Sequence, residues 1–314
     1  MRSKLLAMGA AASSGLISLA VRRSHARLRS LPDAYQGQAI LGFDGDVRYV
    51  ESSDGARIKV IEAGASDGPL TVLVHGFVST AAAWGLVGRR LIEAGHRVVA
   101  LEQRGHGDSA IGRSGHHLPS LGDDLAAVIQ SLDDRPITLV GHSMGTVSAF
   151  ALALRHPRIL DDRVEHFVGA SALYRGRGKP LALELKKHVL YTQAYDWARR
   201  QRPLGIVCTK GALGPHAGFT ATEAVYDMYL EAGPAVIEHF GRELLTFDFT
   251  HALPAFKVPT TLLVGSADNR TPPSISRDIA RRLPAATMLE LPNIGHMTPV
   301  EAPEAIADAV LAAR

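Results

Sequence analysis

The pentapeptide from Gly141 to Gly145 has the residue types of a nucleophile turn. It follows a short β-branched run, Ile137–Val140, and precedes a stretch with helical spacing that ends before Pro157. In such a strand–turn–helix setting, a G-x-S-x-G motif presents the serine hydroxyl on a sharp, strained tip. The two glycines fit because side chains there would collide with the neighbouring strand or helix. We therefore predict that Ser143 is a nucleophile; the alternative is a glycine-rich turn with an inert serine.

The acid that would support this serine is expected further along the chain. A serine hydroxyl needs a base to take its proton, and the base needs an acid that fixes its tautomer and stabilises its charged form. In this motif the acid and then the histidine follow the serine. Asp268 comes just after the strand-like run Thr260–Val264, and the carboxyl ends of parallel strands are where ligands bind. We expect Asp268 to be the acid; an Asx turn before Thr271 is the alternative, and Asp161 and Asp248 are weaker candidates.

The base and the oxyanion donors are expected on two other loops. Of the 14 histidines, His296 is the one on the loop after the last strand-like run, and Gly295 beside it permits a tight loop. We expect His296 to be the base; a solvated loop histidine is the alternative. Acyl transfer also needs donors for the developing oxyanion. We expect them to be the backbone N–H groups of Phe77 and Met144, with Gly76 allowing the turn; alternatively, Gly76 only ends a strand.

Several further residues are expected to contact a substrate. They are Gly76, His142, Trp84 and Met297, although plain core packing is the alternative for the large apolar side chains. Cys208 is the only cysteine, so the chain can form no intramolecular disulfide and no cysteine-based zinc site. We expect neither a metal nor an organic cofactor, because the reaction of this residue set needs none.

The rest of the chain must hold these groups in place. From about Asp44, short β-rich runs alternate with helical stretches, which is typical of βαβ units around a mostly parallel sheet. The helix predicted over Ala81–Ala94 has Gly95 as its stop signal. The predicted strands are Val47–Glu51, Arg57–Ala63, Leu70–Val74, Val98–Leu101, Ile137–Val140, His166–Ala170, Thr260–Val264 and Thr287–Leu291.

A block of mixed helical pattern interrupts this alternation at residues 171–253. It carries aromatic residues and charge clusters such as Lys186-Lys187, and no strand-like run recurs in it. A structureless loop of this length is uncommon in a compact domain. We therefore predict an inserted, mainly helical cap; the alternative is a long excursion with no gating role. The core would then comprise residues 41–170 and 254–314.

The first 40 residues form a separate segment. Leu5–Val21 is apolar and flanked by basic residues, as in a signal peptide, yet it is short for a membrane span. Arg22-Arg23 directly after it suits an uncleaved anchor or a helix lying on a membrane surface. We keep three interpretations: an anchor, a cleaved signal, or a disordered or helical extension, with residues 24–40 as a linker. The protein would be membrane-associated or exported in the first two cases and cytoplasmic otherwise.

Charge is concentrated in the same N-terminal segment. The chain has 314 residues, 46% of them apolar and 21% charged, and a formal net charge of +3. Six basic residues and no acid fall in the first thirty positions, which leaves 28 Lys and Arg against 31 Asp and Glu elsewhere. The basic balance therefore gives no support for a nucleic-acid-binding surface. We expect a small-molecule partner and no nucleic acid, and the oligomeric state is open.

These motifs together resemble the α/β-hydrolase fold superfamily, in particular its capped branch of esterases, monoacylglycerol-type lipases and cofactor-free haloperoxidases. The resemblance covers residues from about 45 to 314 and implies an eight-stranded sheet with a helical cap after the sixth strand. The matching stretches occur in the family's order: His75-Gly76-Phe77, Gln103–Ser109, Gly141–Gly145, Gly265–Asp268 with Thr271-Pro272, and Gly295-His296 followed by Glu301–Glu304. Thr146 departs from a second glycine usual in the family, and Glu102-Gln103 from an aspartate.

We therefore predict a serine hydrolase that cleaves a carboxylic ester with an apolar acyl part. Ser143 argues against the branches whose nucleophile is an aspartate, namely epoxide hydrolases and haloalkane dehalogenases. Alternatives on the same three residues are acyl transfer, perhydrolysis in the haloperoxidase manner, and C–C bond cleavage, because pocket shape distinguishes them. A non-enzymatic alternative is a ligand receptor of this fold.

Overall fold

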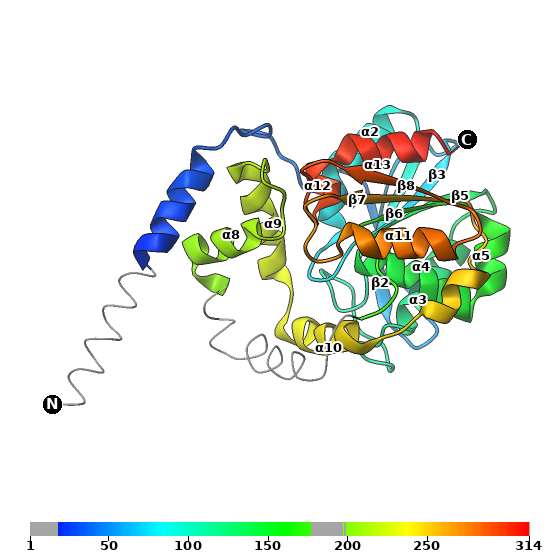
Figure 1. The fold of residues 1–314 in the computed structure, drawn as a ribbon. Coiled ribbons are helices and arrows are strands. Elements are labelled where there is room, and N and C mark those ends of the chain that lie inside the picture. The colour runs from blue at the N-terminus through cyan, green and yellow to red at the C-terminus, as the bar shows by residue number, and fades with distance from the viewer. Residues whose placement is uncertain (1–17, 177–196, 198, 314) are drawn as a thin grey trace.

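Eight strands form one sheet at the centre of the molecule (Figure 1). The computed structural model describes residues 18–176, 197 and 199–313. The strand order is β1-β2-β4-β3-β5-β6-β7-β8; β2 pairs antiparallel with β1 and β4, and the other neighbours are parallel. The strands are β1 (Asp46–Glu51), β2 (Arg57–Gly64), β3 (Leu70–Val74), β4 (Arg97–Leu101), β5 (Ile137–His142), β6 (Val164–Ala170), β7 (Thr260–Gly265) and β8 (Ala286–Leu291). The predicted mostly parallel, eight-stranded sheet is confirmed.

Helices connect the strands. The helix predicted after β3 begins as a 3-10 turn, where the Thr80 hydroxyl accepts a hydrogen bond from Ala82 N–H, and it ends before Gly95, whose φ is +84°. The helices are η1 (Ala81–Trp84), α2 (Gly85–Glu93), α3 (Ser120–Gln130), α4 (Met144–Arg155), α5 (Pro157–Arg163), α8 (Arg202–Lys210), α9 (Phe219–Glu231), α10 (Pro234–Thr246), η2 (Thr250–Ala255), α11 (Pro273–Arg282), α12 (Thr298–Glu301) and α13 (Pro303–Leu311).

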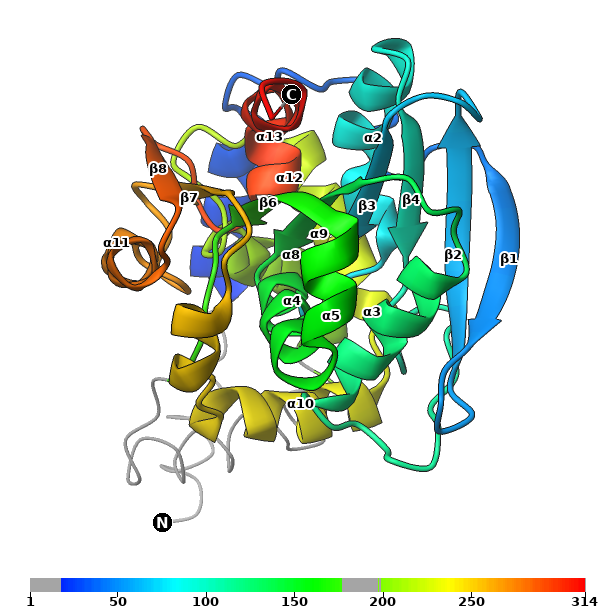
Figure 2. The same ribbon diagram turned by 90° about the vertical axis from the view of Figure 1, so that its right-hand side faces the viewer.

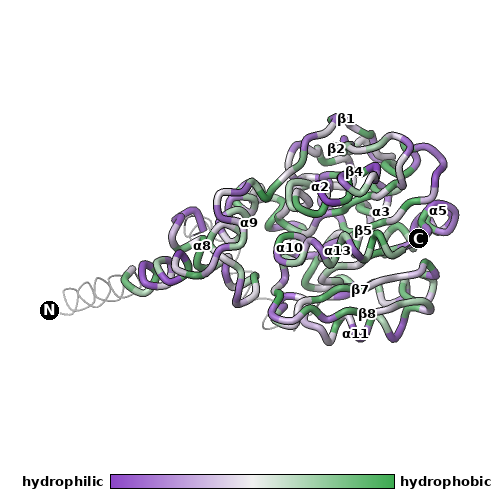
Figure 3. Tube along the Cα trace, turned by 90° about the horizontal axis from the view of Figure 1, so that it is seen from above, coloured by the Kyte–Doolittle hydropathy of each residue, from purple (hydrophilic) through white to green (hydrophobic). Residues whose placement is uncertain are grey.

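The sheet has a hydrophobic layer on each face. Successive side chains of a strand point to opposite faces. On β3, Val72 and Val74 belong to a cluster with side chains of α3 and α4, whereas Leu73 belongs to a cluster with α2 and α13; Figure 2 shows these helix pairs on opposite sides of the sheet. Figure 3 shows β7 as hydrophobic and the outer helix α5 as hydrophilic. Full burial of such a side chain stabilises the fold by ~1.5–3 kcal/mol, so the central strands form a firm base for the loops at their ends.

Helices α8, α9 and α10 lie between β6 and β7, within the block predicted to be helical. Residues 177–196 and 198 of this block, with Lys186-Lys187, lie outside the described residues. Helix α10 packs on the loop after β4, where the rings of Phe240 and His106 stack with centroids 5.8 Å apart. Helix α9 reaches the loop after β3. The described part of the insertion therefore contacts loops at the carboxyl edge of the sheet.

The N-terminal segment differs from the prediction. Residues 18–29 form a helix, which lies beside α8 and α9 in Figure 1. Its Leu28 side chain is buried against Ile206 and Tyr226 of those helices. The predicted linker over residues 24–40 is therefore wrong in its first part, because an apolar anchor among the arginines fixes it to the insertion.

Most of the apolar stretch Leu5–Val21 lies outside the described residues, so the structure does not choose among the three interpretations of that segment. Within residues 18–176, 197 and 199–313, every helix is too short or too polar to cross a bilayer.

Candidate active site

Ser143 occupies the predicted turn between β5 and α4. Its φ of 50° and ψ of −115° are unfavourable for a residue with a side chain. The flanking glycines have the expected reason: a Cβ at Gly145 would lie 2.1 Å from the Val74 carbonyl oxygen, and one at Gly141 would lie 2.8 Å from backbone atoms of Gly145. Packing on both sides of the turn therefore holds the serine in a strained conformation.

The structure brings Ser143, His296 and Asp268 together at the carboxyl edge of the sheet. The Ser143 hydroxyl oxygen is 3.1 Å from His296 Nε2. On the other side of the ring, His296 Nδ1 is 2.9 Å from Asp268 Oδ2. All three residues are buried. At these distances a proton can pass from the hydroxyl to the imidazole, while the carboxylate faces the opposite ring nitrogen.

Asp268 satisfies both interpretations made from the sequence. Its Oδ1 accepts the backbone N–H groups of Arg270 and Thr271, each at 2.8 Å, as in an Asx turn. Its Oδ2 faces His296 and also accepts the Thr271 hydroxyl at 2.8 Å. Burial alone would raise the pKa of Asp268, but the charge of His296 and the hydrogen bonds from His296 and Thr271 lower it to about 2. The carboxylate therefore stays ionised at neutral pH and is fixed in orientation.

The backbone around His296 is held by groups that the sequence did not reveal. His296 N–H donates to the Ala212 carbonyl oxygen in the insertion at 2.7 Å. Its own carbonyl oxygen accepts His142 Nε2–H at 2.8 Å and the Ser171 hydroxyl at 3.2 Å. Burial above all, and then the nearby charge of His296, lowers the pKa of His142 to about 3. His142 is thus a neutral donor that orients the histidine loop, a role different from the substrate contact predicted for it.

Hydrogen bonds and close packing fix the loop after β3. A Cβ at Gly76 would lie 2.8 Å from His142 Nδ1, so only glycine fits there. His75 Nε2 accepts Gln103 N–H at 3.0 Å, which leaves Nδ1 as the donor to the Gly76 carbonyl oxygen at 2.7 Å. The Gln103 side chain donates to the His75 carbonyl oxygen at 2.6 Å. Gln103, a departure from the family pattern, is therefore a brace of this loop.

The two residues expected to donate to an oxyanion lie at the start of α4 and in the loop after β3. Met144 is the first residue of α4, so its N–H has no acceptor within the helix, and the helix dipole there favours a negative charge. Phe77 follows the braced Gly76 and is half-buried. Val78 beside it has φ of 50°, an outlier for a β-branched residue.

Residues with strained backbone conformations lie at the carboxyl edge of the sheet. In the described part of the chain, the non-glycine residues with positive φ are Val78, Ser143, Ser171 and Asn293. They lie in the loops after β3, β5, β6 and β8 respectively. Strained residues persist only where the surroundings over-determine them, and they cluster at functional sites. The strain therefore marks the same edge as the three meeting side chains.

The remaining predicted substrate contacts have other positions. Trp84 is fully buried in the cluster between the sheet, α2 and α13. Core packing, the alternative given above, thus applies to it, because the 3-10 turn that begins at Ala81 directs it inward. Met297 is buried in a cluster with insertion side chains, and its sulfur accepts the Tyr229 hydroxyl at 3.2 Å.

Thr146 and Ser171 support the site and were missed as such. The Thr146 hydroxyl donates to the Ser143 carbonyl oxygen at 2.7 Å and accepts Leu173 N–H at 3.1 Å. It thereby ties the nucleophile turn to the chain after β6. Its place in the motif was noted from the sequence, whereas nothing local indicated Ser171. Among the described residues, no group of three or more His, Cys, Asp or Glu side chains is arranged to hold a metal ion.

Residues 71–309 match the family described as the alpha/beta hydrolase family, and the chain belongs to that family. The conclusion agrees with the strand order, with the strained serine between β5 and α4, and with the resemblance seen in the sequence.

The chain is also similar to individual proteins and solved structures. The AB hydrolase superfamily protein YfhM of Bacillus subtilis is 34% identical over 120 residues, which are 38% of this chain and 42% of that protein, so the match spans less than half of it. The bifunctional esterase/perhydrolase DCH of Acinetobacter calcoaceticus is 28% identical over 280 residues, 84% of this chain and 98% of that protein. The solved structure of a thermophilic esterase from Thermogutta terrifontis has a TM-score of 0.69 and 26% identity, and the match covers 85% of this chain and 97% of that one. Other matching proteins are named as an epoxide hydrolase and a magnesium-chelatase subunit.

Proposed function

We propose that this protein is a serine hydrolase that cleaves a carboxylic ester through an acyl-enzyme. The observation that carries the proposal is the relay of Ser143, His296 and Asp268, with spacings of 3.1 and 2.9 Å. The family also contains enzymes with other nucleophiles, but a serine with positive φ at a helix N-terminus suits attack on an acyl carbon. The esterase names of full-length relatives support the same substrate class.

The proposed mechanism uses each group at a stated atom. His296 Nε2 takes the hydroxyl proton as Ser143 Oγ attacks the acyl carbon, and Asp268 stabilises the resulting imidazolium. The backbone N–H groups of Phe77 and Met144 receive the negative charge that develops on the carbonyl oxygen. His296 then gives its proton to the leaving alcohol. Water, activated by His296 in turn, attacks the acyl group and restores Ser143.

We propose further that the insertion acts as a cap over this edge and that the substrate has an apolar acyl part. Helix α9 contacts the loop after β3 through the Ser79 hydroxyl and Met228 sulfur, 3.3 Å apart. Tyr229 of the same helix bonds to Met297, and α10 packs on His106. These contacts support a cap because they all lie on loops at the carboxyl edge. Their largely apolar character favours an apolar substrate.

Membrane contact through the N-terminal segment is part of the same proposal. The helix over residues 18–29 exposes Arg22, Arg23 and Arg27, which would attract anionic headgroups. Vesicles of anionic phospholipid should therefore retain the full chain in a flotation assay, whereas neutral vesicles should not. A chain carrying Arg22→Gln, Arg23→Gln and Arg27→Gln should float less; equal flotation would contradict membrane contact through this helix.

A p-nitrophenyl ester series of increasing acyl length tests the hydrolase proposal. We expect turnover by the wild type and a fall of about a thousandfold or more in Ser143→Ala. Ser274→Ala, an exposed serine on α11, is the matched control and should retain full activity. Absence of turnover across the series by folded wild type would contradict the ester proposal and favour a receptor.

Perhydrolysis is a second candidate, because a full-length relative is named as a bifunctional esterase/perhydrolase. Here hydrogen peroxide replaces water as the acceptor of the acyl group, and the product is a peracid. Adding peroxide to a turning-over ester and assaying the peracid distinguishes the two. Loss of both products in Ser143→Ala would place them on the same acyl-enzyme.

A further inference from the structure

Glu301 lies on the far side of the histidine loop and binds the backbone on both sides of His296. Its Oε2 accepts Gly295 N–H at 3.2 Å, and its Oε1 accepts Met297 N–H at 3.2 Å. The same Oε2 accepts Gly214 N–H of the insertion at 2.5 Å. One carboxylate therefore gathers three backbone donors, two of which flank the residue proposed as the base.

The insertion and the histidine loop meet there at backbone contact distance. A Cβ at Gly214 would lie 2.0 Å from the Asn293 carbonyl oxygen, and a Cβ at Gly295 would lie 2.3 Å from Gly214 N. Neither position tolerates a side chain, because the opposing atoms are backbone. The nearby bond from His296 N–H to the Ala212 carbonyl oxygen joins the same two segments. Gly214 and Gly295 thus allow the two backbones to touch, and the Glu301 carboxylate accepts a hydrogen bond from each of them.

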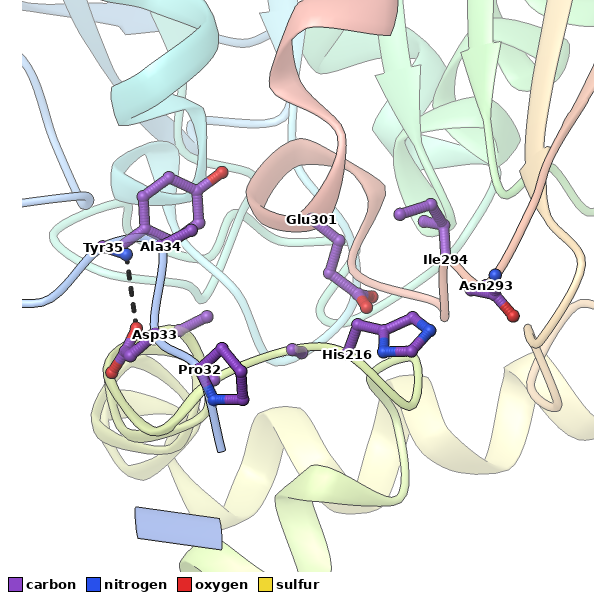
Figure 4. A pocket seen from close by; sticks show the side chains of 11 residues that line it. Pro32, Asp33, Ala34, Tyr35, His216, Asn293, Ile294 and Glu301 are labelled. Carbon is purple, nitrogen blue, oxygen red and sulfur yellow. Dashed lines mark hydrogen bonds between the residues drawn. The ribbon is translucent and has the colours of Figure 1, made fainter. Parts of the chain in front are cut away.

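Charge around the carboxylate supports this arrangement. Lys210, at the end of α8, donates to the carbonyl oxygens of Gly214 at 2.5 Å and Ala217 at 2.7 Å, and it attracts Glu301. Burial raises the pKa of Glu301 above its usual value, and the three backbone donors and Lys210 partly offset this. In Figure 4 the Glu301 side chain extends from α12 toward the loop carrying Asn293.

Glu301 lines a cavity together with other titratable residues. The cavity measures about 410 Å³, and its lining does not include the three residues of the relay. Among the described titratable groups, Lys210 acts on the Glu301 carboxylate, and His296 lies on the clamped loop. Asp33, Tyr35 and His216 line the same cavity as Glu301. The pKa of Tyr35 is raised to about 12, by burial first and then by Glu304 and Glu301, so Tyr35 is neutral at the pH of any assay.

We propose that Glu301 is a positioning residue, which clamps the loop that carries His296 and fastens it to the 212–214 segment of the insertion. The inference rests on the proposed function of the relay. It adds that the Glu301 carboxylate holds both the insertion and the loop of the catalytic histidine. Loss of its hydrogen bonds to either segment would displace the imidazole from Ser143. A displacement of about 1 Å in such a site can cost about a hundredfold in rate.

The test compares Glu301→Gln with Glu304→Gln. Glutamine keeps the length but has a single acceptor oxygen, so it cannot receive the donors on both sides of His296. We expect kcat to fall about 10- to 100-fold with KM nearly unchanged, because the substrate pocket is intact. Glu304 is exposed in the first turn of α13, and its variant should match the wild type.

A pH profile separates positioning from a general loss of structure. Protonated Glu301 resembles glutamine, so the ratio of wild-type to Glu301→Gln activity should shrink as the pH falls toward the raised pKa of Glu301. A pH-independent ratio would contradict the proposal.

Labelling of Ser143 by a fluorophosphonate distinguishes the possible failures. If the wild type is labelled and Glu301→Gln is labelled equally fast, the clamp is wrong while the serine hydrolase stands. If the folded wild type is not labelled, the proposed function itself fails. Should the variant not fold, hydrogen exchange of the wild type decides: amides of Gly214, Gly295 and Met297 must be protected at neutral pH, and rapid exchange would overturn the clamp.

Discussion

The nucleophile turn and the histidine loop reach the same point in space by different means. Ser143 lies between β5, which is buried at every position, and α4, which is buried over most of its length. His296 follows β8, a strand at the sheet edge with mostly exposed or half-exposed side chains. The first is held mainly by close packing of its two glycines against β3 and the start of α4. The second is held by hydrogen bonds from three remote segments, through His142, Ser171 and Ala212, and by the nearby Glu301 carboxylate.

The comparison predicts different failure modes. A turn held by packing fails by losing stability, because overpacking strains the core. A loop held by hydrogen bonds fails by losing its geometry while the fold persists. Substitutions on the two sides should therefore separate the free energy of unfolding from kcat.

The largest expected effect is on turnover, from changes within the relay. His296→Ala removes the base, and Asp268→Asn removes the charge that stabilises the imidazolium and its correct tautomer. We expect each to lower kcat for a p-nitrophenyl ester by about a thousandfold or more, since members of such a set act as a unit. His117→Ala, an exposed histidine elsewhere, is the control. A relay variant with more than a tenth of wild-type kcat would rule out the assigned roles.

In the nucleophile turn, Gly145→Ala should lower the free energy of unfolding. The added Cβ would lie 2.1 Å from the Val74 carbonyl oxygen, so β3 or α4 must shift. Overpacking of this kind costs about 1–3 kcal/mol in the free energy of unfolding, to be measured by urea denaturation. At Gly233, the N-cap of α10, a Cβ would meet no heavy atom within 4 Å, so Gly233→Ala should lower the urea midpoint much less than Gly145→Ala. Equal midpoints for the two variants would show that packing does not set the turn.

A smaller effect is expected from Thr146→Val, which keeps the shape and removes a hydroxyl. Leu173 N–H and the Ser143 carbonyl oxygen each lose a buried partner. We expect a loss of about 1–3 kcal/mol in the free energy of unfolding, with a smaller change in kcat than any relay variant. Thr246→Val, at the exposed end of α10, is the control. A variant as stable as the wild type would mean that the hydroxyl is dispensable.

The smallest expected effect is a change of the free energy of unfolding with pH. Burial lowers the pKa of His106 to about 4 and that of His142 to about 3. Because the unfolded chain binds protons at higher pH than these buried rings, stability should fall as the pH drops from about 6.5 to about 4. The lowered pKa of Asp268, about 2, acts in a separate window, and its contribution is lost only below about pH 4. Urea midpoints that stay constant between pH 7 and about 4 would contradict buried neutral histidines.

The sequence predicted the elements and the three relay residues because their signals are local. Glycines around Ser143, a β-branched run before it and a loop histidine after the last strand are all visible over a few residues. The supports of His296 were not predictable in this way. Ala212 and Ser171 reach the loop only through tertiary folding, and no spacing rule links them to it. Glu301 lies only five residues after His296, but its contact with Gly214 of the insertion is also tertiary.

Two other differences also have physical causes. Trp84 was expected near a substrate, but a short 3-10 turn rotates it into the core. The stretch after Arg23 was expected to be a linker, yet Leu28 packs against α8 and α9, and His25 and Arg29 contact the Phe219 ring of α9. A few scattered contacts of this kind leave no clear periodic pattern in the sequence.

The central claim is that His296 activates Ser143. Reaction with a fluorophosphonate, followed by peptide mass spectrometry, tests it most directly. The account predicts one phosphonyl group on the peptide containing Ser143 in the wild type, a rate lower by orders of magnitude in His296→Ala, and none in Ser143→Ala. Labelling of Ser143 at the same rate with and without the imidazole, or no labelling of the folded wild type, would contradict it.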